Sequence, residues 1–383
     1  MTDLERILPL WRELEAAGED YVLATVAAVE GSSYRRPGAC MLLAPDGRRA
    51  GTVSGGCLEA QVASRAWWLT AHGPTLQRYS TAEEDGDLPY GSGCGGVVFL
   101  LLERRATAGP LLSALGRAFE RRTPLAVATV LEGEQLGRRA FAGLGQDSAE
   151  GVQNTTAPLQ NLAELALAGG KSMEKKIAVE GTEVRVWADV RPARTGLWIF
   201  GAGDDAQPLL RLAKELGWFV VIADGRSHLA KRERFPLADE IRVLPMREIP
   251  SSGGLLSTAG LRPGDAAVLM THSFEQDARA LASLLALDAA PAYIGVLGPQ
   301  RRTRELLAEA ARLLGLPVGP AGSTVDRVER WLEQLHAPTG LDLGAESPET
   351  IALSVVAEIQ KSLSGATALP LREVRATAAA IAR

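Results

Sequence analysis

Residues 197–224 constrain the fold of this 383-residue chain more than any other stretch. An apolar run at 197–200 leads directly into Gly201-Ala202-Gly203, and a pattern of helical period follows as far as residue 216. A second apolar run, 218–223, ends in Asp224, about 20 positions after the glycine turn, where dinucleotide-binding folds place the acid that holds a ribose. The order of strand, glycine turn, helix, strand and acid predicts a Rossmann-like, doubly wound parallel-sheet domain.

The same turn argues against ordinary NAD binding. Asp204 and Asp205 follow Gly203 at the expected start of the helix, where they would repel a pyrophosphate. Two more strands are expected at 266–270 and 292–296, and His272 and Gly298 follow them at the sheet edge where open α/β sheets bind ligands. His272 fits an ordinary surface loop equally well.

The second informative feature is the glycine turn at 51–59. Ser54, Gly55, Gly56 and Cys57 stand between a short strand that ends with residues 49–53 and a helical pattern that begins near residue 58. Glycines there allow positive φ and leave backbone N–H groups pointing into one concavity, and the helix N-terminus adds partial positive charge. We therefore expect an anion-friendly turn with a stabilised Cys57 thiolate.

A related element follows at 91–96, where Gly93, Cys94, Gly95 and Gly96 precede a strand. One glycine-flanked cysteine alone is more simply a small buried side chain beside a tight turn. Two in one chain predict a shared pocket that contains the Cys57 and Cys94 thiols. Cys40 lies on an alternating strand pattern, so we expect it to be packed or inert.

The loop at 30–38 combines Ser32, Ser33, Arg35 and Arg36 with glycines. Hydroxyl and guanidinium groups suit an anionic ligand such as a phosphate. A solvated arginine pair on a turn is the simpler alternative for this loop taken alone.

Composition excludes several classes of function. The net charge of -5 and the lack of a dense basic run argue against nucleic acid as a partner. Three cysteines without CxxC spacing make no disulfide framework, and four scattered histidines argue against a zinc site. Residues 1–20 lack the apolar core of a signal peptide, and no apolar run reaches the roughly 20 residues of a membrane span. We expect a cytoplasmic protein with no membrane association.

Residues 191–196 have the composition of a linker. The chain is thus expected to be α/β, with a mixed α+β domain at 1–190 and the Rossmann-like domain at 196–383. The second domain should end in a helix capped by Ser347.

Nine motifs, in order, are similar to those of the XdhC/CoxI family, the maturation factors of xanthine dehydrogenase, carbon monoxide dehydrogenase and related molybdenum hydroxylases. They lie at residues 31–38, 54–59, 93–96, 200–203, 224–226, 234–236, 270–272, 293–298 and 340–344. Residues 103–194 are poorly covered by the resemblance. The chain departs from the family at Asp204, where histidine is common, and at Gly225, where proline is frequent, which leaves the ligand of the Rossmann-like domain open.

The resemblance implies a chaperone that binds molybdenum cofactor, protects it while a sulfido ligand is installed, and delivers it to an apo molybdenum hydroxylase. It implies that Cys57 and Cys94 handle the cofactor, with Cys57 a candidate contact to molybdenum. The remaining candidate cofactor-binding residues are Ser32, Ser33, Arg35, Ser54, Gly55, Gly56, Glu59, Gly93, Gly95 and Gly96 in the first domain, and Gly201, Gly203, Asp224, Arg226, His272 and Gly298 in the second.

The expected partners are the apo-hydroxylase, a cysteine desulfurase and further copies of this chain in a homo-oligomer such as a dimer, with a nucleotide in the Rossmann-like domain left open. An NAD(P)-dependent oxidoreductase is the alternative function, although the sequence shows no clear acid–base pair near the glycine turn. A nucleotide-sensing regulatory protein is the third. The sequence leaves open which hydroxylase is served and whether the cofactor is molybdopterin or its dinucleotide.

Overall fold

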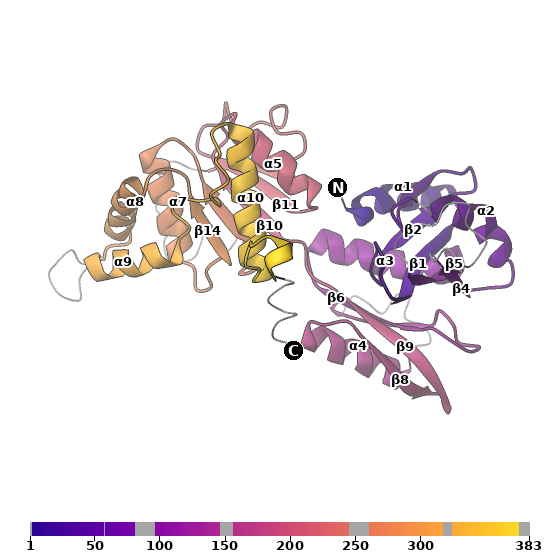
Figure 1. Cartoon of the computed structure of the whole chain (residues 1–383). Coiled ribbons are helices and arrows are strands. Elements are labelled where there is room, and N and C mark those ends of the chain that lie inside the picture. Colours follow the sequence, from indigo (N-terminus) through magenta and orange to yellow (C-terminus); the bar gives the residue numbers. More distant parts are fainter. Residues whose placement is uncertain are drawn as a thin grey trace. The chain divides into compact units, whose positions relative to one another are not determined.

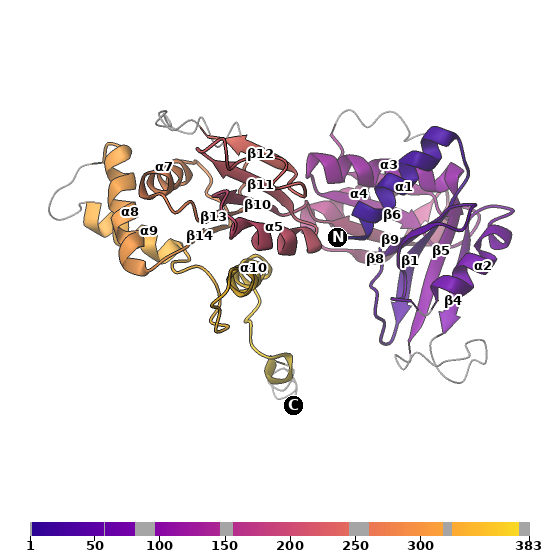
Figure 2. The same cartoon turned by 90° about the horizontal axis from the view of Figure 1, so that it is seen from above.

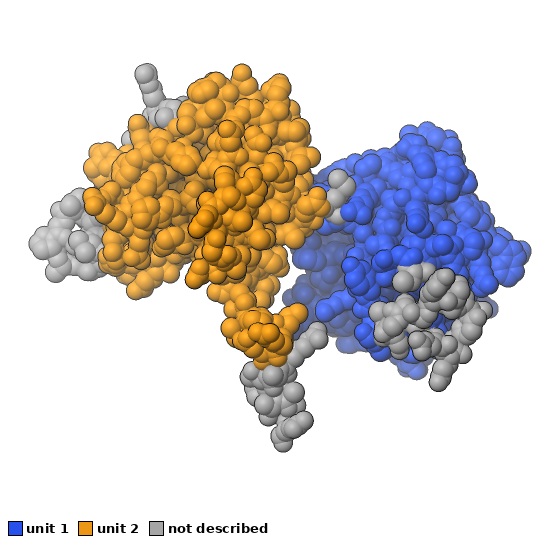
Figure 3. All heavy atoms as spheres, turned by 45° about the horizontal axis from the view of Figure 1, so that its top comes forward, with its two compact units in different colours: residues 1–194 blue, residues 195–383 orange. Residues whose placement is uncertain are grey.

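The computed structural model describes residues 2–56, 58–80, 96–145, 156–244, 260–316 and 324–374. The chain forms two compact units, Met1–Arg194 and Thr195–Arg383 (Figure 3). The division falls within the 191–196 segment.

The first unit is a mixed α+β structure (Figure 1). Its helices are α1 (Asp3–Ala17), α2 (Glu59–Leu69), α3 (Arg105–Arg121) and α4 (Ala157–Gly169). Its strands are β1 (Val22–Glu30), β2 (Cys40–Leu43), β3 (Arg49–Gly51), β4 (Thr75–Ser80), β5 (Val97–Arg104), β6 (Leu125–Val130), β7 (Arg139–Ala142), β8 (Met173–Val179) and β9 (Thr182–Arg191).

Two antiparallel sheets organise this unit. The larger has the strand order β3-β2-β1-β5-β4, and the smaller has the order β7-β6-β9-β8. Apolar side chains alternate across β1, so that Leu23 faces a core made with α1 and α3, while Ala24 faces a core made with α2. Both faces of the larger sheet are therefore buried. Helix α4 covers the smaller sheet through Leu159 and Leu162.

The second unit contains a five-stranded parallel sheet with the order β12-β11-β10-β13-β14. Its strands are β10 (Gly196–Phe200), β11 (Phe219–Asp224), β12 (Glu240–Val243), β13 (Ala266–Leu269) and β14 (Tyr293–Val296). Its helices are α5 (Ala206–Glu215), α7 (Phe274–Leu285), α8 (Gln300–Leu313), α9 (Thr324–Gln334) and α10 (Pro348–Ser364). The expected Rossmann-like architecture is confirmed.

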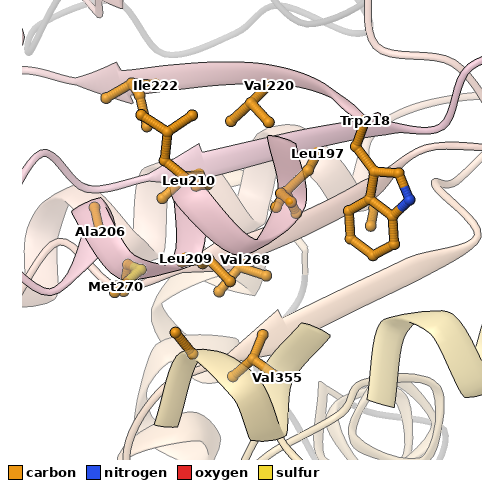
Figure 4. Close-up of a cluster of buried hydrophobic side chains, with 14 of the residues drawn as sticks. Leu197, Ala206, Leu209, Leu210, Trp218, Val220, Ile222, Val268, Met270 and Val355 are labelled. Carbon is orange, nitrogen blue, oxygen red and sulfur yellow. The ribbon is translucent and has the colours of Figure 1, made fainter. Parts of the chain in front are cut away.

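Helices cover both faces of this sheet (Figure 2). Leu209 of α5 and Val355 of α10 pack on one face with Leu197 and Val268, as Figure 4 shows. Helices α7 and α8 pack on the opposite face around Trp198. Helix α10 begins at the expected cap, since the Ser347 side chain accepts a hydrogen bond from the Thr350 amide.

Candidate functional site

The described candidate residues of the first unit gather at one edge of the larger sheet. β1 ends at Glu30 opposite Val97, where β5 begins, and Val97 also pairs with Ser80 at the end of β4. β3 ends on the same side, because Gly51 pairs with Met41 near the start of β2. The loop 31–38, residues 52–56 and Gly96 therefore all lie at this single edge.

The turn 52–58 is organised around one acidic side chain. Glu59, the first residue of α2, is 3% exposed, and its carboxylate accepts hydrogen bonds from the turn that precedes it. The Ser54 hydroxyl donates to Oε2 at 2.6 Å, and the Ser54 amide donates to Oε1 at 2.9 Å. The amides of Val53 and Gly56 and the Thr52 hydroxyl donate to the same carboxylate. With the Gly55 amide, which donates to Oε1 at 3.2 Å, six polar groups of one loop converge on Glu59.

These hydrogen bonds determine the protonation of Glu59. Burial alone would raise the pKa of its carboxyl group, but the hydrogen bonds from Ser54 and Thr52 outweigh burial and lower the pKa to about 2. Among the described residues, no cation lies within ion-pair distance of Glu59. The buried charge is held by N–H and O–H dipoles and by the N-terminus of α2.

This arrangement differs from the expected open concavity. Gly55 and Gly56 do adopt positive φ, at 91° and 127°, and the N–H groups do point inward. They point at Glu59, so the chain's own carboxylate occupies the place expected for a ligand phosphate. The sequence contained the signal, since Glu59 follows the glycine turn directly and the free amides of such a turn need an acceptor.

The loop 31–38 lies against this turn and against the start of β5. The side of the Tyr34 ring that carries Cδ1 and Cε1 faces Gly55, where an added Cβ would lie 2.8 Å from Cδ1. A Cβ on Gly96 would overlap the carbonyl of Ser32. Two glycines of the two predicted cysteine motifs are thus in contact with the same loop.

The two arginines of this loop differ in their contacts. Arg35 forms an ion pair with Asp3, and the Ser33 hydroxyl donates to the Arg35 carbonyl at 2.9 Å. Arg36 is exposed, and no described residue forms an ion pair with its guanidinium group. Arg35 therefore anchors the loop, and Arg36 is the cation that is open to a ligand.

The cysteine predictions have different outcomes. Cys57, Gly93, Cys94 and Gly95 lie outside the described residues, so a pocket shared by the two thiols stays a prediction. Cys40 is 4% exposed, its thiol donates to the Gly38 carbonyl at 3.2 Å, and burial raises its pKa. The prediction that Cys40 is packed is confirmed.

In the second unit, Asp224 is used within the protein. It is fully buried at the end of β11, and Oδ2 accepts the Ala202 amide at 2.9 Å. The backbone amide and the guanidinium group of Arg226 bind the same carboxylate at 2.8–3.0 Å. Burial opposes ionisation, but the hydrogen bonds from Arg226 and Ala202 lower the pKa of Asp224. The expected ribose acceptor is therefore an internal ion pair.

The glycines of this unit permit close packing at the same edge. A Cβ on Gly201, whose φ is 139°, would lie 2.6 Å from the carbonyl oxygen of Met270 at the end of β13. A Cβ on Gly298 would lie 3.5 Å from Cδ of Arg302. The Arg302 guanidinium binds the buried Asp277 at 2.7 Å, and Asp277 accepts the Thr271 hydroxyl at 2.7 Å. These residues hold the strand ends together.

The structure also shows an acid–histidine pair that the sequence did not indicate. His272 has a φ of 58°, and its Nε2 lies 2.8 Å from Oδ2 of Asp205. The position that a Cβ of Gly203 would occupy is 4.0 Å from the His272 ring. Asp204 is paired instead with Arg234, at 2.8 Å. An acid–base pair thus stands beside the glycine turn, because residues 67 positions apart meet where β10 and β13 end.

Two negative findings concern the described part of the chain. It contains no group of three or more histidine, cysteine, aspartate or glutamate residues that could hold a metal ion. None of its helices is long and apolar enough to cross a membrane.

Comparison with known proteins identifies related chains along most of this length. Residues 14–80 match the model of the XdhC and CoxI family, and residues 197–359 match that of the XdhC Rossmann domain. A Bacillus subtilis protein named as a probable subunit of xanthine dehydrogenase is 32% identical over 89% of this chain and 92% of its own length. The molybdenum cofactor insertion chaperone PaoD of Escherichia coli is 27% identical over 94% of this chain and 89% of its own.

A solved structure agrees with these sequence matches. A crystal structure described as a xanthine dehydrogenase from Bacillus halodurans is 28% identical, covers 95% of this chain and 96% of its own, and superposes with a TM-score of 0.68. The matches extend over both units, and the glycine turns described above fall within the matched regions. The chain belongs to the XdhC/CoxI family.

Proposed function

We propose that this protein is a maturation chaperone of molybdenum hydroxylases, which binds molybdenum cofactor as its cargo, shelters it and delivers it to the apo-enzyme. The observation that carries the proposal is the meeting of the loop 31–38, the turn 52–58 and Gly96 at one sheet edge. Nearly the whole chain is similar to a protein named as a molybdenum cofactor insertion chaperone, and this similarity supports molybdenum cofactor as the ligand of this edge.

The free groups at this edge fit such a cargo. Molybdenum cofactor carries a phosphate, a pterin with a planar pyrimidine ring and a metal held by a dithiolene, and it supplies the redox chemistry once it is in the hydroxylase. The exposed Ser32 hydroxyl, the Arg36 guanidinium and the Tyr34 ring offer a donor, a cation and an aromatic surface. These groups suit the phosphate and the pterin.

Arg36 is the residue proposed to bind the phosphate. A guanidinium group binds phosphate with two parallel hydrogen bonds, and its charge is useful only if no internal carboxylate has neutralised it. Arg35 is neutralised by Asp3, whereas Arg36 is exposed. The backbone amides of the 52–58 turn serve a different purpose, because Glu59 holds the turn in its bound shape before the cargo arrives.

Cys57 and Cys94 are proposed as the soft ligands near the metal. Thiolates are soft ligands of the same kind as the dithiolene sulfurs that already hold the metal. Gly55 and Gly56 directly precede Cys57 in the chain, and Gly96 follows Cys94 by two residues. Gly55 and Gly96 both lie against the loop 31–38. A cysteine desulfurase as sulfur donor, a homodimeric state and a cytoplasmic location belong to the same proposal.

Retention of cofactor by the full-length protein tests this function. The wild-type chain should retain molybdenum cofactor through gel filtration and activate an apo-hydroxylase of the xanthine dehydrogenase type. Arg36→Ala should lower cofactor affinity about tenfold, since a hydrogen bond to a charged group contributes roughly 1.5–3 kcal/mol. Arg12→Ala is the control, because its guanidinium group is already engaged by Glu120 and it lies outside the loop 31–38.

Cys57→Ala and Cys94→Ala test the thiols in the same assay. Each should reduce retention and activation while leaving the melting temperature nearly unchanged, because truncating a thiol to a methyl group removes little packing. Equal activation by both variants and the wild type would show that neither thiol handles the cofactor.

One observation favours a second function. The Asp205–His272 pair beside Gly203 supplies the acid–base pair that an NAD(P)-dependent oxidoreductase would need. The name of the Bacillus subtilis relative, a probable dehydrogenase subunit, points in the same direction. A permanent subunit would co-purify with its partner in fixed ratio and require NAD(P) for turnover, whereas a chaperone would release the partner after loading it.

A further inference from the structure

We propose that the Tyr34 ring is the platform on which the planar pyrimidine ring of the cargo's pterin stacks. The inference rests on the proposed function and assigns one residue to one part of the ligand. Its basis is the unusual combination of an exposed aromatic ring with a fixed position.

The backbone on both sides of Tyr34 is held in place. The Ser33 hydroxyl donates to the Arg35 carbonyl at 2.9 Å, and the Arg35 side chain forms an ion pair with Asp3 of α1. The Ser32 carbonyl lies so close to Gly96 that a side chain there would overlap it. A loop tied to α1 and to the start of β5 presents its central residue in a defined position, which lowers the entropic cost of binding.

The ring itself is supported by the neighbouring turn. An added Cβ at Gly55 would lie 2.8 Å from Cδ1 and 2.9 Å from Cε1 of Tyr34. Gly55 also has a φ of 91°, which side-chain-bearing residues rarely adopt. The backbone of the 52–58 turn therefore forms a seat for one side of the ring, and Glu59 fixes that seat by accepting the Gly55 and Gly56 amides.

The rest of the ring is open. Tyr34 is 74% exposed, and none of the described residues forms a hydrogen bond with its hydroxyl. Tyrosine usually buries its ring and uses its hydroxyl as a polar handle. The exposed Tyr34 ring therefore offers apolar surface that a flat ligand could cover. Planar heterocycles stack on such rings with a contribution that depends on the ring and not on the hydroxyl.

The ring also lies close in the chain to the residue proposed to bind the phosphate. Arg36 is two residues away and exposed. A ligand that carries both a pterin and a phosphate would then meet an aromatic surface and a free cation from one short loop. This match in chemistry distinguishes Tyr34 from Trp68, which is 77% exposed but lies at the opposite end of α2 from Glu59.

Equilibrium binding to the full-length chain tests the inference, with molybdenum cofactor released anaerobically from a molybdenum hydroxylase as the probe. Tyr34→Ala should weaken binding about tenfold, as expected for loss of one stacking partner. Tyr34→Phe should bind like the wild type, and Trp68→Ala, the matched exposed aromatic, should also be unchanged. Tyr34→Trp should bind the cofactor with quenching of the new indole fluorescence.

The outcomes separate this inference from the proposed function. If the wild type binds the cofactor and Tyr34→Ala binds equally well, the stacking role is wrong and the chaperone function stands. If Tyr34→Phe loses as much affinity as Tyr34→Ala, the hydroxyl rather than the ring makes the contact, and stacking is again wrong. If the wild type binds no cofactor, both proposals fail. Unchanged melting temperatures of the variants would exclude misfolding as the cause of any loss.

Discussion

The glycine turn 52–58 of the first unit and the glycine turn 201–206 of the second are both closed by a carboxylate of the chain itself. In the first, Glu59 follows Gly56 by three residues and accepts the amides of the turn before its own helix. In the second, Asp224 comes from the next strand and accepts the Ala202 amide. A glycine turn is therefore insufficient evidence for an anion site, because its N–H groups need an acceptor even without a ligand.

The two acids differ in how their charge is balanced. Asp224 is paired with the guanidinium group of Arg226 at 2.8 Å. Glu59 is surrounded by N–H and O–H donors, with no described cation within ion-pair distance. The first turn thus depends on dipoles that all point at one anion, and the second on an ion pair that is one-third exposed on its arginine side. Removing the charge of Glu59 should therefore lower the free energy of unfolding more than removing that of Asp224.

Glu59→Gln should have the largest effect on stability. The amide replaces one acceptor oxygen by an NH₂ group, which would face either the Val53 and Ser54 amides at the Oε1 position or the Ser54 hydroxyl and the Gly56 amide at the Oε2 position. We expect a loss of about 3 kcal/mol in the free energy of unfolding, measured by urea denaturation of the full chain. Glu13→Gln, at an exposed position of α1, is the control and should change stability by less than about 0.5 kcal/mol. A loss at position 59 no larger than the control would contradict this account of the turn.

The same variant should flatten the acid dependence of stability. The pKa of Glu59 is about 2 in the folded chain, against an ordinary value of 4.5. Because the folded pKa is the lower one, its contribution is fully present above pH 4.5 and is lost as the pH falls through 4.5 toward 2. Unfolding measured across this window should show a smaller slope in Glu59→Gln than in the wild type.

Asp224→Asn should have a smaller effect, in the second unit. The asparagine oxygen can still accept the Ala202 amide, and Arg226 can gain water because it is one-third exposed. We expect a loss of about 2 kcal/mol, since a buried hydrogen-bonded charge pair is broken on one side. Asp204→Asn, at a 93% exposed side chain, is the matched control. A loss greater than that of Glu59→Gln would reverse the ranking of the two turns.

Much of the fold was predictable because it depends on local patterns. The strand, glycine turn, helix and strand at 197–224 follow from periodicity and turn residues, and β10, α5 and β11 are found there. The hairpin of β2 and β3 and the cap at Ser347 follow from equally local signals. Family membership was predictable from the order of the motifs.

The partners of the site residues were not predictable, because they depend on contacts between distant segments. Arg35 and Arg36 are adjacent and chemically identical, yet only Arg35 meets Asp3, which α1 brings to the loop. His272 and Asp205 meet only because β10 and β13 are neighbours in the sheet. A sequence pattern selects residue types, whereas the fold decides which of their polar groups remain free.

Cys40→Ala should cost about 1 kcal/mol, the amount typical of removing a small buried group from a well-packed region. Cys40 lies between Thr25 and Gly38 and is covered by neighbouring side chains, so its thiol contributes packing and one weak hydrogen bond. Cofactor retention should be the same as in the wild type. This variant is the thiol control for Cys57 and Cys94, and a loss of cofactor from it would remove the distinction between packed and cofactor-handling cysteines.

The smallest expected effect is the binding of NAD or NADP to the second unit, which should be undetectable. Both oxygens of Asp224 are already bonded to Arg226, and Oδ2 also accepts the Ala202 amide, so a ribose would find no free acceptor and a pyrophosphate would lose one turn amide. Calorimetric titration of the full chain should give no saturable binding, with a Kd weaker than about 1 mM. Gly203→Val is the matched variant, because a side chain at this position would overlap the Asp205 carboxylate that holds His272. Micromolar binding to the wild type that Gly203→Val abolishes would show that the internal ion pair opens for a nucleotide, and it would favour the oxidoreductase over the chaperone.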